Sequence, residues 1–262
     1  LNESFATYAD MLWDEKTGGA EFLQFKAWHA QQQYLAYVGK EHIIRPMEYR
    51  YYDTRDEMYN EEHTYLKGAL ILHTLRWILG DNDFFSALSY YLHKHEFSLV
   101  ESMDFKCAIE EKTGRNLQWF FDQWVFSGGH PRFDVSYRYH PERNIVDLAV
   151  KQTQPIVDGQ TLFALPVEVR IDTKSGIMID TVWVENEMDH FMLGADGEPR
   201  MVSFDGRGAL VSEVAFEKEP KELAYQIGHD ALPGRLWALR QMVGRFPSHP
   251  QTMKALRSIL GS

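Results

Sequence analysis

The sequence of 262 residues predicts a multidomain α+β protein with helices first, an antiparallel β-sandwich next and short helices last. Residues 1–130 carry apolar side chains at helical spacing. Residues 131–218 alternate apolar and polar side chains between frequent turns, and residues 219–262 return to helical spacing. These changes of pattern divide the chain into three predicted domains: 1–130, 131–218 and 219–262.

The first two helices are predicted from their apolar faces and their glycines. Residues 5–17 place Phe5, Ala9 and Leu12 on one face together with Tyr8, and the helix should stop at Gly18 and Gly19. The next helix covers residues 21–42, and Pro46 ends the helical pattern after it. Its predicted apolar face consists of Phe22, Phe25, Trp28 and Leu35.

Four more helices complete the predicted N-terminal part. Residues 62–80 form the most apolar of them, and Gly80 should end it. Residues 82–95 begin with Asn82 or Asp83 as a cap, and residues 102–114 begin with Ser102 or Asp104. Residues 116–127 close this part before two glycines and a proline.

The alternating pattern begins at Arg132 and continues to about Glu217. It predicts strands in FDVSYRYH, IVDLAVKQTQ, TLFALPVEVRID, GIMIDTVWVE, DHFMLG and PRMVSFD. Turn residues recur every eight to twelve positions, roughly the rhythm of an antiparallel sandwich. From Pro220 onward, short helices joined by brief loops indicate the start of a helical array.

Composition excludes several classes of function. The net charge of −11 would repel nucleic-acid phosphates, so no nucleic-acid partner is expected. The longest apolar runs fall short of the roughly 18 residues that cross a bilayer, so no membrane span is expected. Cys107 is the single cysteine and excludes an internal disulfide, which is typical of a reducing compartment and predicts a cytoplasmic protein.

A self-contained catalytic motif is not visible in the sequence. It has no G-x-S-x-G elbow, no P-loop, no C-x-x-C and no H-E-x-x-H. The spacing of its histidines along the predicted helices does not favour a shared metal ion. Taken one at a time, Glu3 is typical of a surface carboxylate, Tyr65 of a core residue, and Cys107 of a small buried residue.

Three segments together resemble the M1 family of zinc aminopeptidases, the relatives of aminopeptidase N and leukotriene A4 hydrolase. LNESFA is similar to the family's L-N-E-G-F-A segment, HTYLKGALILHTL to its Y-x-K-G-A segment, and WVFSGGHPRFDVSY to the junction that leads into a β-sandwich. RPMEYRYYDTRDEMY fits the stretch between the first two. The resemblance implies that residues 1–130 are the C-terminal helical part of a thermolysin-like catalytic domain.

The same resemblance implies the roles of two residues. Glu3 takes the position of the third zinc ligand, and Tyr65 takes that of the catalytic tyrosine that hydrogen-bonds the oxyanion. In the family, Zn²⁺ polarises the scissile carbonyl and acidifies a water molecule. Ser4 stands where the family usually has glycine, and we expect this change beside the pocket to tune substrate fit.

The family's H-E-x-x-H and G-x-M-E-N segments would precede Leu1. We therefore expect the chain to be part of a zinc aminopeptidase that acts on peptides, while the chain alone is inactive and lacks tightly bound zinc. Apolar surface near Phe5, Trp13 and Tyr65 would then be exposed, and it offers a route to self-association. Two alternatives stay open: a non-catalytic scaffold of the same fold, and a separate binding module. Retention of both Glu3 and Tyr65 favours the enzyme.

Overall fold

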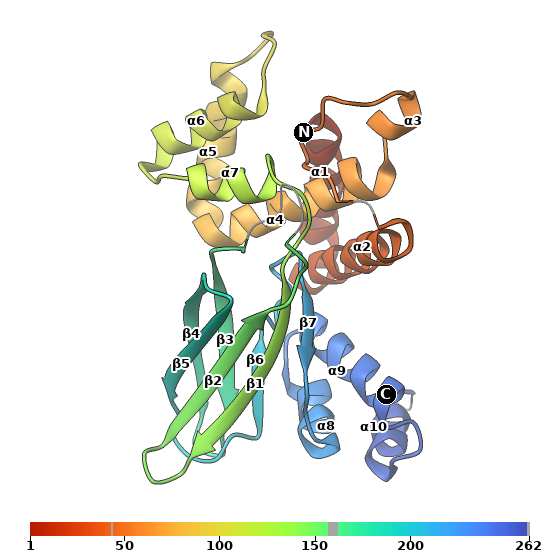
Figure 1. Ribbon diagram of the computed structural model, residues 1–262, viewed down its shortest axis with the longest axis vertical. Helices are drawn as coiled ribbons and strands as arrows, with labels where there is room; N and C mark the ends of the chain where they lie inside the picture. Colours follow the sequence, from red (N-terminus) through yellow and green to blue (C-terminus); the bar gives the residue numbers. More distant parts are fainter. Residues whose placement is uncertain (43, 157–161, 261–262) are drawn as a thin grey trace. The chain divides into compact units, whose positions relative to one another are not determined.

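The computed structural model describes residues 1–42, 44–156 and 162–260. The chain forms two compact units (Figure 1). The first unit comprises Leu1–Pro131, Pro155–Phe163 and Ala209–Val211, and its regular elements are helices. The second comprises Arg132–Gln154, Ala164–Gly208 and Ser212–Ser262, and it contains both β-sheets and helices α8 to α10. The predicted α+β fold class is confirmed.

Helix α1 (Asn2–Gly18) buries only Tyr8 of the face that its apolar residues predicted. Ser4, Tyr8 and Met11 point into the unit. A groove of about 450 Å³ runs along the other side, and it is largely apolar. Its lining includes Phe5, Ala9, Leu12, Leu88, Leu92 and Val100. Phe5, Ala9 and Leu12 of the predicted face therefore line an open groove, while Tyr8 packs inward beside Met11.

Helix α2 (Ala20–Glu41) corrects the sequence prediction in the same way. Phe22 and Phe25 are 45% and 42% exposed. The buried side chains are Leu23, Ala27, Ala30, Tyr34 and Val38. Two of these five residues are alanines, so the buried side is not the one that carries the phenylalanines. Phe25 instead stacks on Trp28 along the helix surface.

The predicted helix over residues 62–80 is divided in the structure. After a short helix α3 (Arg55–Met58), residues Glu61–Lys67 form the π-helix η1, and α4 (Gly68–Leu79) follows it directly. Helix α4 is the core of the first unit, since its buried residues lie all around the helix axis. It ends as predicted at Gly80, whose φ of 79° glycine adopts without strain.

Helices α5 (Asp81–Lys94), α6 (Ser102–Thr113) and α7 (Gln118–Trp124) complete the first unit. The predicted caps shift by one or two residues: Gly80 precedes α5, and Glu101 caps α6 in a reciprocal capping box with Asp104. Arg76 ties three helices together. Its guanidinium contacts Glu15 of α1 at 2.7 Å and Asp81 of α5 at 2.8 Å.

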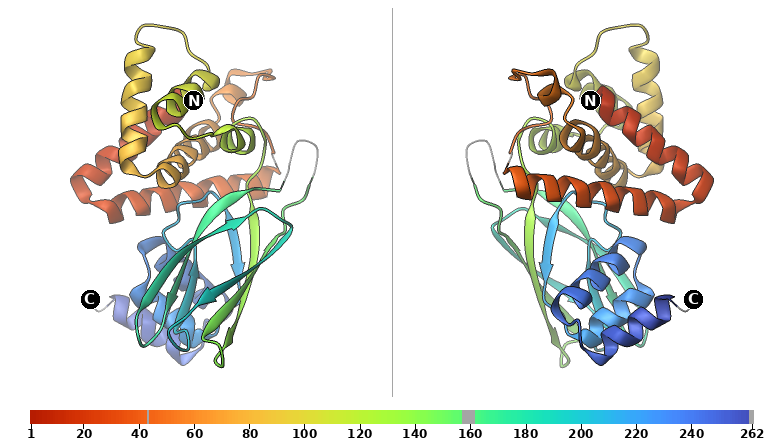
Figure 2. Two further views of the ribbon diagram at one scale, coloured as in Figure 1. Left: turned by 90° about the vertical axis from the view of Figure 1, so that its left-hand side faces the viewer. Right: turned by 90° about the vertical axis from the view of Figure 1, so that its right-hand side faces the viewer.

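The second unit contains two sheets that lie face to face (Figures 1 and 2). The strand order is β5-β2-β1-β7 in one and β4-β3-β6 in the other. Their bounds are Arg132–His140 (β1), Ile145–Gln152 (β2), Leu165–Asp172 (β3), Ile177–Val184 (β4), Met188–Gly194 (β5), Met201–Phe204 (β6) and Glu213–Phe216 (β7). Phe133 of β1 meets Phe204 of β6 with ring centroids 5.3 Å apart, so aromatic side chains join the two sheets.

One strand pairing differs from the antiparallel prediction. β7 runs parallel to β1, with Arg132 opposite Glu213 and Val135 opposite Phe216. A parallel pair cannot be joined by a tight hairpin, and here strands β2 to β6 lie between β1 and β7 in the sequence. Local turn signals therefore could not reveal this pairing.

Helices α8 (Pro220–His229), α9 (Leu232–Arg245) and α10 (Pro250–Leu260) follow the sandwich. A polar network fixes α8 to β6. Lys218 donates to Gln226 Oε1 at 2.7 Å, and Asp230 accepts hydrogen bonds from Gln226 and from Ser203 of β6. Among the described residues, every helix is too short or too polar to cross a membrane.

Candidate active site

Glu3 lies in the first turn of α1, where the positive end of the helix dipole favours a carboxylate. Its side chain is only partly buried. It lines a cavity of about 440 Å³, so the carboxylate faces open space rather than the core.

Tyr65 is carried by the π-helix η1, a rare element that is frequent at functional sites. Asn60 caps this helix by accepting a hydrogen bond from the His63 amide at 2.8 Å, and it donates one to Tyr37 of α2 at 2.9 Å. The His63 ring donates its Nε2 proton to the Pro46 carbonyl at 2.9 Å. Lys67, the last residue of η1, is completely buried with Nζ 5.6 Å from the centre of the Tyr34 ring. The turn that carries Tyr65 is therefore anchored along its length.

Glu3 and Tyr65, far apart in sequence, are neighbours in the structure. Ser4 and Thr64, their sequence neighbours, are joined by a hydrogen bond of 2.9 Å. The pKa of the Tyr65 phenol lies above its usual value because of desolvation and then because of the nearby Glu3 charge. Tyr65 therefore keeps its proton at neutral pH and can donate a hydrogen bond. The fold brings together the two residues that the family resemblance singles out.

Ser4 is not a pocket residue, and the expectation that it tunes substrate fit is wrong. Its side chain is fully buried, and its hydroxyl donates a hydrogen bond to the Thr64 carbonyl at 2.9 Å. A Cβ atom added at Gly68 would lie 2.0 Å from this hydroxyl oxygen. Ser4 therefore occupies the space between α1 and the junction of η1 with α4.

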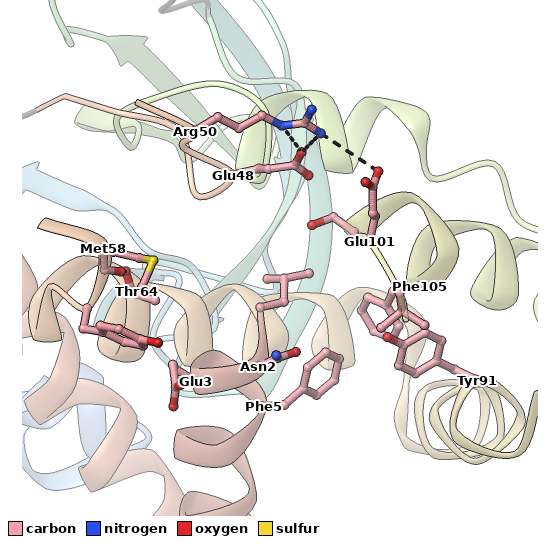
Figure 3. Close-up of a pocket in the computed structure, with 14 residues that line it drawn as sticks. Asn2, Glu3, Phe5, Glu48, Arg50, Met58, Thr64, Tyr91, Glu101 and Phe105 are labelled. Carbon is pink, nitrogen blue, oxygen red and sulfur yellow. Dashed lines mark hydrogen bonds and ion pairs between the residues drawn. The ribbon is translucent and has the colours of Figure 1, made fainter. Parts of the chain in front are cut away.

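The cavity beside Glu3 has an acidic wall and an aromatic wall (Figure 3). Arg50 bridges Glu48 at 2.5 Å and Glu101 at 3.9 Å. Asn2 and Phe5 project from α1 toward the cavity, and Tyr91 and Phe105 add two more rings. With Glu3, Glu48 and Glu101 against one guanidinium, the site favours cationic groups.

Sequence reasoning did not identify Glu48, Arg50 or Glu101, because charged residues in loops and at helix ends are ordinarily solvated. Only the segment containing Glu48 and Arg50 was matched to the family, and that match gave no role to either residue. The prediction that Cys107 is buried is wrong, because this residue is exposed on α6.

His63 makes the stability of this site sensitive to acid. Burial, together with the charges of Lys67 and Arg45, lowers the pKa of His63 from 6.5 to about 3. Between about pH 6.5 and pH 3, His63 binds a proton in the unfolded chain but not in the folded chain. The free energy of unfolding therefore falls as the pH drops through this range. From pH 7 to pH 5 this residue should cost about 2 kcal/mol of unfolding free energy.

Urea unfolding at both pH values, with His63→Gln for comparison, measures this effect. Glutamine can still donate to the Pro46 carbonyl but does not titrate. The loss between pH 7 and pH 5 should be about 2 kcal/mol smaller in His63→Gln than in the wild type. Equal losses in the two proteins would contradict the assignment.

A catalytic zinc ion is held by about three protein ligands. In the part of the chain that the structure describes, no three His, Cys, Asp or Glu side chains are grouped to hold a metal ion. Glu3 can therefore supply one ligand, but the described residues do not complete a zinc centre.

Comparisons with known proteins agree with this geometry. Residues 1–124 match the sequence profile described as "Peptidase family M1 domain". Aminopeptidase N of Streptomyces lividans is 27% identical over 164 residues, which cover 59% of this chain and 18% of that protein. Transcription initiation factor TFIID subunit 2 of Caenorhabditis elegans is 26% identical over 107 residues, covering 41% of this chain and 10% of that protein.

The fold itself matches a solved structure. The crystal structure of Legionella pneumophila aminopeptidase A in complex with aspartic acid superposes with a TM-score of 0.79 at 18% identity, over 99% of this chain and 30% of that one. The chain thus spans only 10% to 18% of the length of the two curated relatives named above. The similarity to peptidase family M1 is thus carried by residues 1–124, slightly less than half of the chain.

Proposed function

We propose that the chain is part of a zinc-dependent aminopeptidase that removes N-terminal amino acids from peptides. The observation that carries this proposal is the hydrogen bond from Ser4 to Thr64, which holds the turn that carries Glu3 next to the turn that carries Tyr65, with Glu3 lining an acidic cavity. In the proposed roles, Glu3 supplies one zinc ligand and Tyr65 donates its phenolic hydrogen bond to the oxyanion formed at the scissile carbonyl. The negative wall of the cavity suits the ammonium group at the N-terminus of a peptide.

Zinc content and aminoacyl-amide hydrolysis, measured together in the longer parent protein, test this function. Glu3→Ala should lose both bound zinc and activity. Glu48→Ala, which removes a carboxylate from the opposite wall of the same cavity, should keep its zinc. A parent protein that hydrolyses aminoacyl amides at the wild-type rate after Glu3→Ala would overturn the proposed role of this residue.

We further propose that the 262-residue chain alone is inactive. One carboxylate does not hold catalytic zinc, which requires about three protein ligands. The purified chain should show less than stoichiometric zinc by elemental analysis and no aminopeptidase activity. Stoichiometric zinc that disappears in Glu3→Ala would contradict this prediction.

A second candidate function is that of a non-catalytic scaffold. The similarity to TFIID subunit 2 of Caenorhabditis elegans and of Drosophila melanogaster favours it, at 26% and 28% identity. The proximity of Glu3 and Tyr65 favours the enzyme, since a scaffold does not require a carboxylate and a phenol on adjoining turns beside a cavity. A parent protein that binds no zinc and hydrolyses no aminoacyl amide would support the scaffold.

A further inference from the structure

Ser4 and Thr64 are the immediate sequence neighbours of the two proposed site residues. Ser4 follows Glu3 on α1, and Thr64 comes just before Tyr65 on η1. The hydrogen bond from the Ser4 hydroxyl to the Thr64 carbonyl, at 2.9 Å, joins the two backbones at this point. We infer that Ser4 is a positioning residue, which fixes the turn of η1 that carries Tyr65 relative to the turn of α1 that carries Glu3.

Two features make this bond suited to such a role. First, Ser4 is fully buried, so water does not compete for the Thr64 carbonyl from its side. Second, Thr64 lies inside a π-helix, where carbonyls bond five residues ahead and the ladder is less regular than in an α-helix. The hydroxyl of a residue on another helix, here Ser4 of α1, can therefore donate a hydrogen bond to a π-helix carbonyl. This bond fixes the orientation of the turn that contains Thr64.

The space around Ser4 supports the same assignment. A Cβ at Gly68 would lie 2.0 Å from the Ser4 Oγ and 2.6 Å from the Ser4 Cβ. The absence of a side chain at Gly68 thus leaves room for the Ser4 hydroxyl at the junction of η1 and α4. In this space the Ser4 side chain packs against the Cα of Gly68 and bonds the Thr64 carbonyl, so it joins the two segments where they meet.

This inference rests on the proposed role of Tyr65, but it can be tested without activity. The probe is the ¹³C resonance of the Tyr65 ring carbon that bears the hydroxyl, assigned with Tyr65→Phe and recorded at pH 7, where the phenol is protonated. Glu3→Gln should shift this resonance in the wild-type background. In a Ser4→Ala background the same substitution should no longer shift it, because the hydrogen bond that fixes the two turns has been lost.

Thr74→Val is the matched control. The Thr74 hydroxyl also donates to a backbone carbonyl, that of Ala209 at 2.7 Å, and it is buried in the same unit on α4. Its removal should lower stability in the same way as Ser4→Ala while the Tyr65 resonance still responds to Glu3→Gln. A response that disappears in both backgrounds would show a general loss of structure and would overturn the inference.

A second variant covers the case in which Ser4→Ala folds poorly. The double variant Ser4→Gly with Gly68→Ala returns a methyl group to the shared space without restoring the hydroxyl. It should fold and still lack the Tyr65 response to Glu3→Gln. An unchanged response in either folded variant would overturn the positioning role.

Kinetics of the parent protein separate this inference from the proposed function. Ser4→Ala should lower kcat with little change in KM, since the loss affects a contact made in the transition state, and Thr74→Val should leave kcat unchanged. If Ser4→Ala abolishes the response of the Tyr65 resonance to Glu3→Gln but the parent keeps its full kcat, the catalytic role of Tyr65 is refuted and the positioning role stands. If the Tyr65 resonance of Ser4→Ala still responds fully to Glu3→Gln, the positioning role is refuted and the proposed function is unaffected.

Discussion

The parent protein carrying Tyr65→Phe is expected to hydrolyse aminoacyl amides about 10²- to 10³-fold more slowly than the wild type. The phenyl ring keeps the packing of η1, and only the hydroxyl is lost. Because the oxyanion exists only beyond the ground state, the loss should fall on kcat while KM changes little. The raised pKa of Tyr65 means that the donor stays protonated across neutral and mildly alkaline pH.

Tyr59→Phe is the matched control for this experiment. Tyr59 lies just before η1, and it lines the cavity beside Glu3. The same change of phenol to phenyl at this position should leave kcat close to that of the wild type. Full activity in Tyr65→Phe, or an equal loss in Tyr59→Phe, would contradict the oxyanion role of Tyr65.

Lys67→Met is expected to stabilise the first unit by a few kcal/mol at pH 7. Lys67 is completely buried, and its ammonium has no hydrogen-bond partner among the described residues. Burial, and then the charge of Arg45, lower the pKa of Lys67 from 10.5 to about 7. Methionine fills a similar volume without a charge, so it removes the desolvation cost and gives up only the contact with the Tyr34 ring.

The pH dependence of this effect has a defined sign. Between pH 7 and 10.5 the unfolded chain holds a proton on Lys67 that the folded chain tends to release, so wild-type stability rises with pH in this window. The advantage of Lys67→Met should therefore shrink by about 2 kcal/mol from pH 7 to pH 9. Urea unfolding at both pH values measures it, and Lys67→Arg, which cannot lose its charge, should be less stable than the wild type at both. An advantage of Lys67→Met that is constant with pH would contradict the buried neutral amine.

Much of the fold follows from the sequence because its strongest patterns are local. The apolar run of α4 and the alternation in β1 and β2 give the element type directly. The face that α2 buries did not follow, because Ala27 and Ala30 compete with Phe22 and Phe25, and shape rather than hydrophobicity decides between them. The π-helix could not be predicted either. It differs from an α-helix only in its hydrogen bonds, which join residues five apart instead of four.

The candidate site was predictable only in part. Glu3 and Tyr65 were found through their family motifs, and their residue types alone would have placed one on the surface and the other in the core. The contact between Ser4 and Thr64 depends on two segments meeting in space, which the sequence of either segment does not specify. The same holds for Lys67, because a lysine is almost never fully buried and its burial contradicts every local expectation.

The anchoring of η1 has a consequence for how substrate binding energy is used. Asn60, His63 and Lys67 hold this turn to α2 and to the segment at Pro46 whether or not a peptide is bound. The conformational entropy of orienting Tyr65 is thus lost during folding rather than during catalysis. The hydrogen-bond donor is therefore oriented before a peptide binds, and no binding free energy of the peptide is needed to order it.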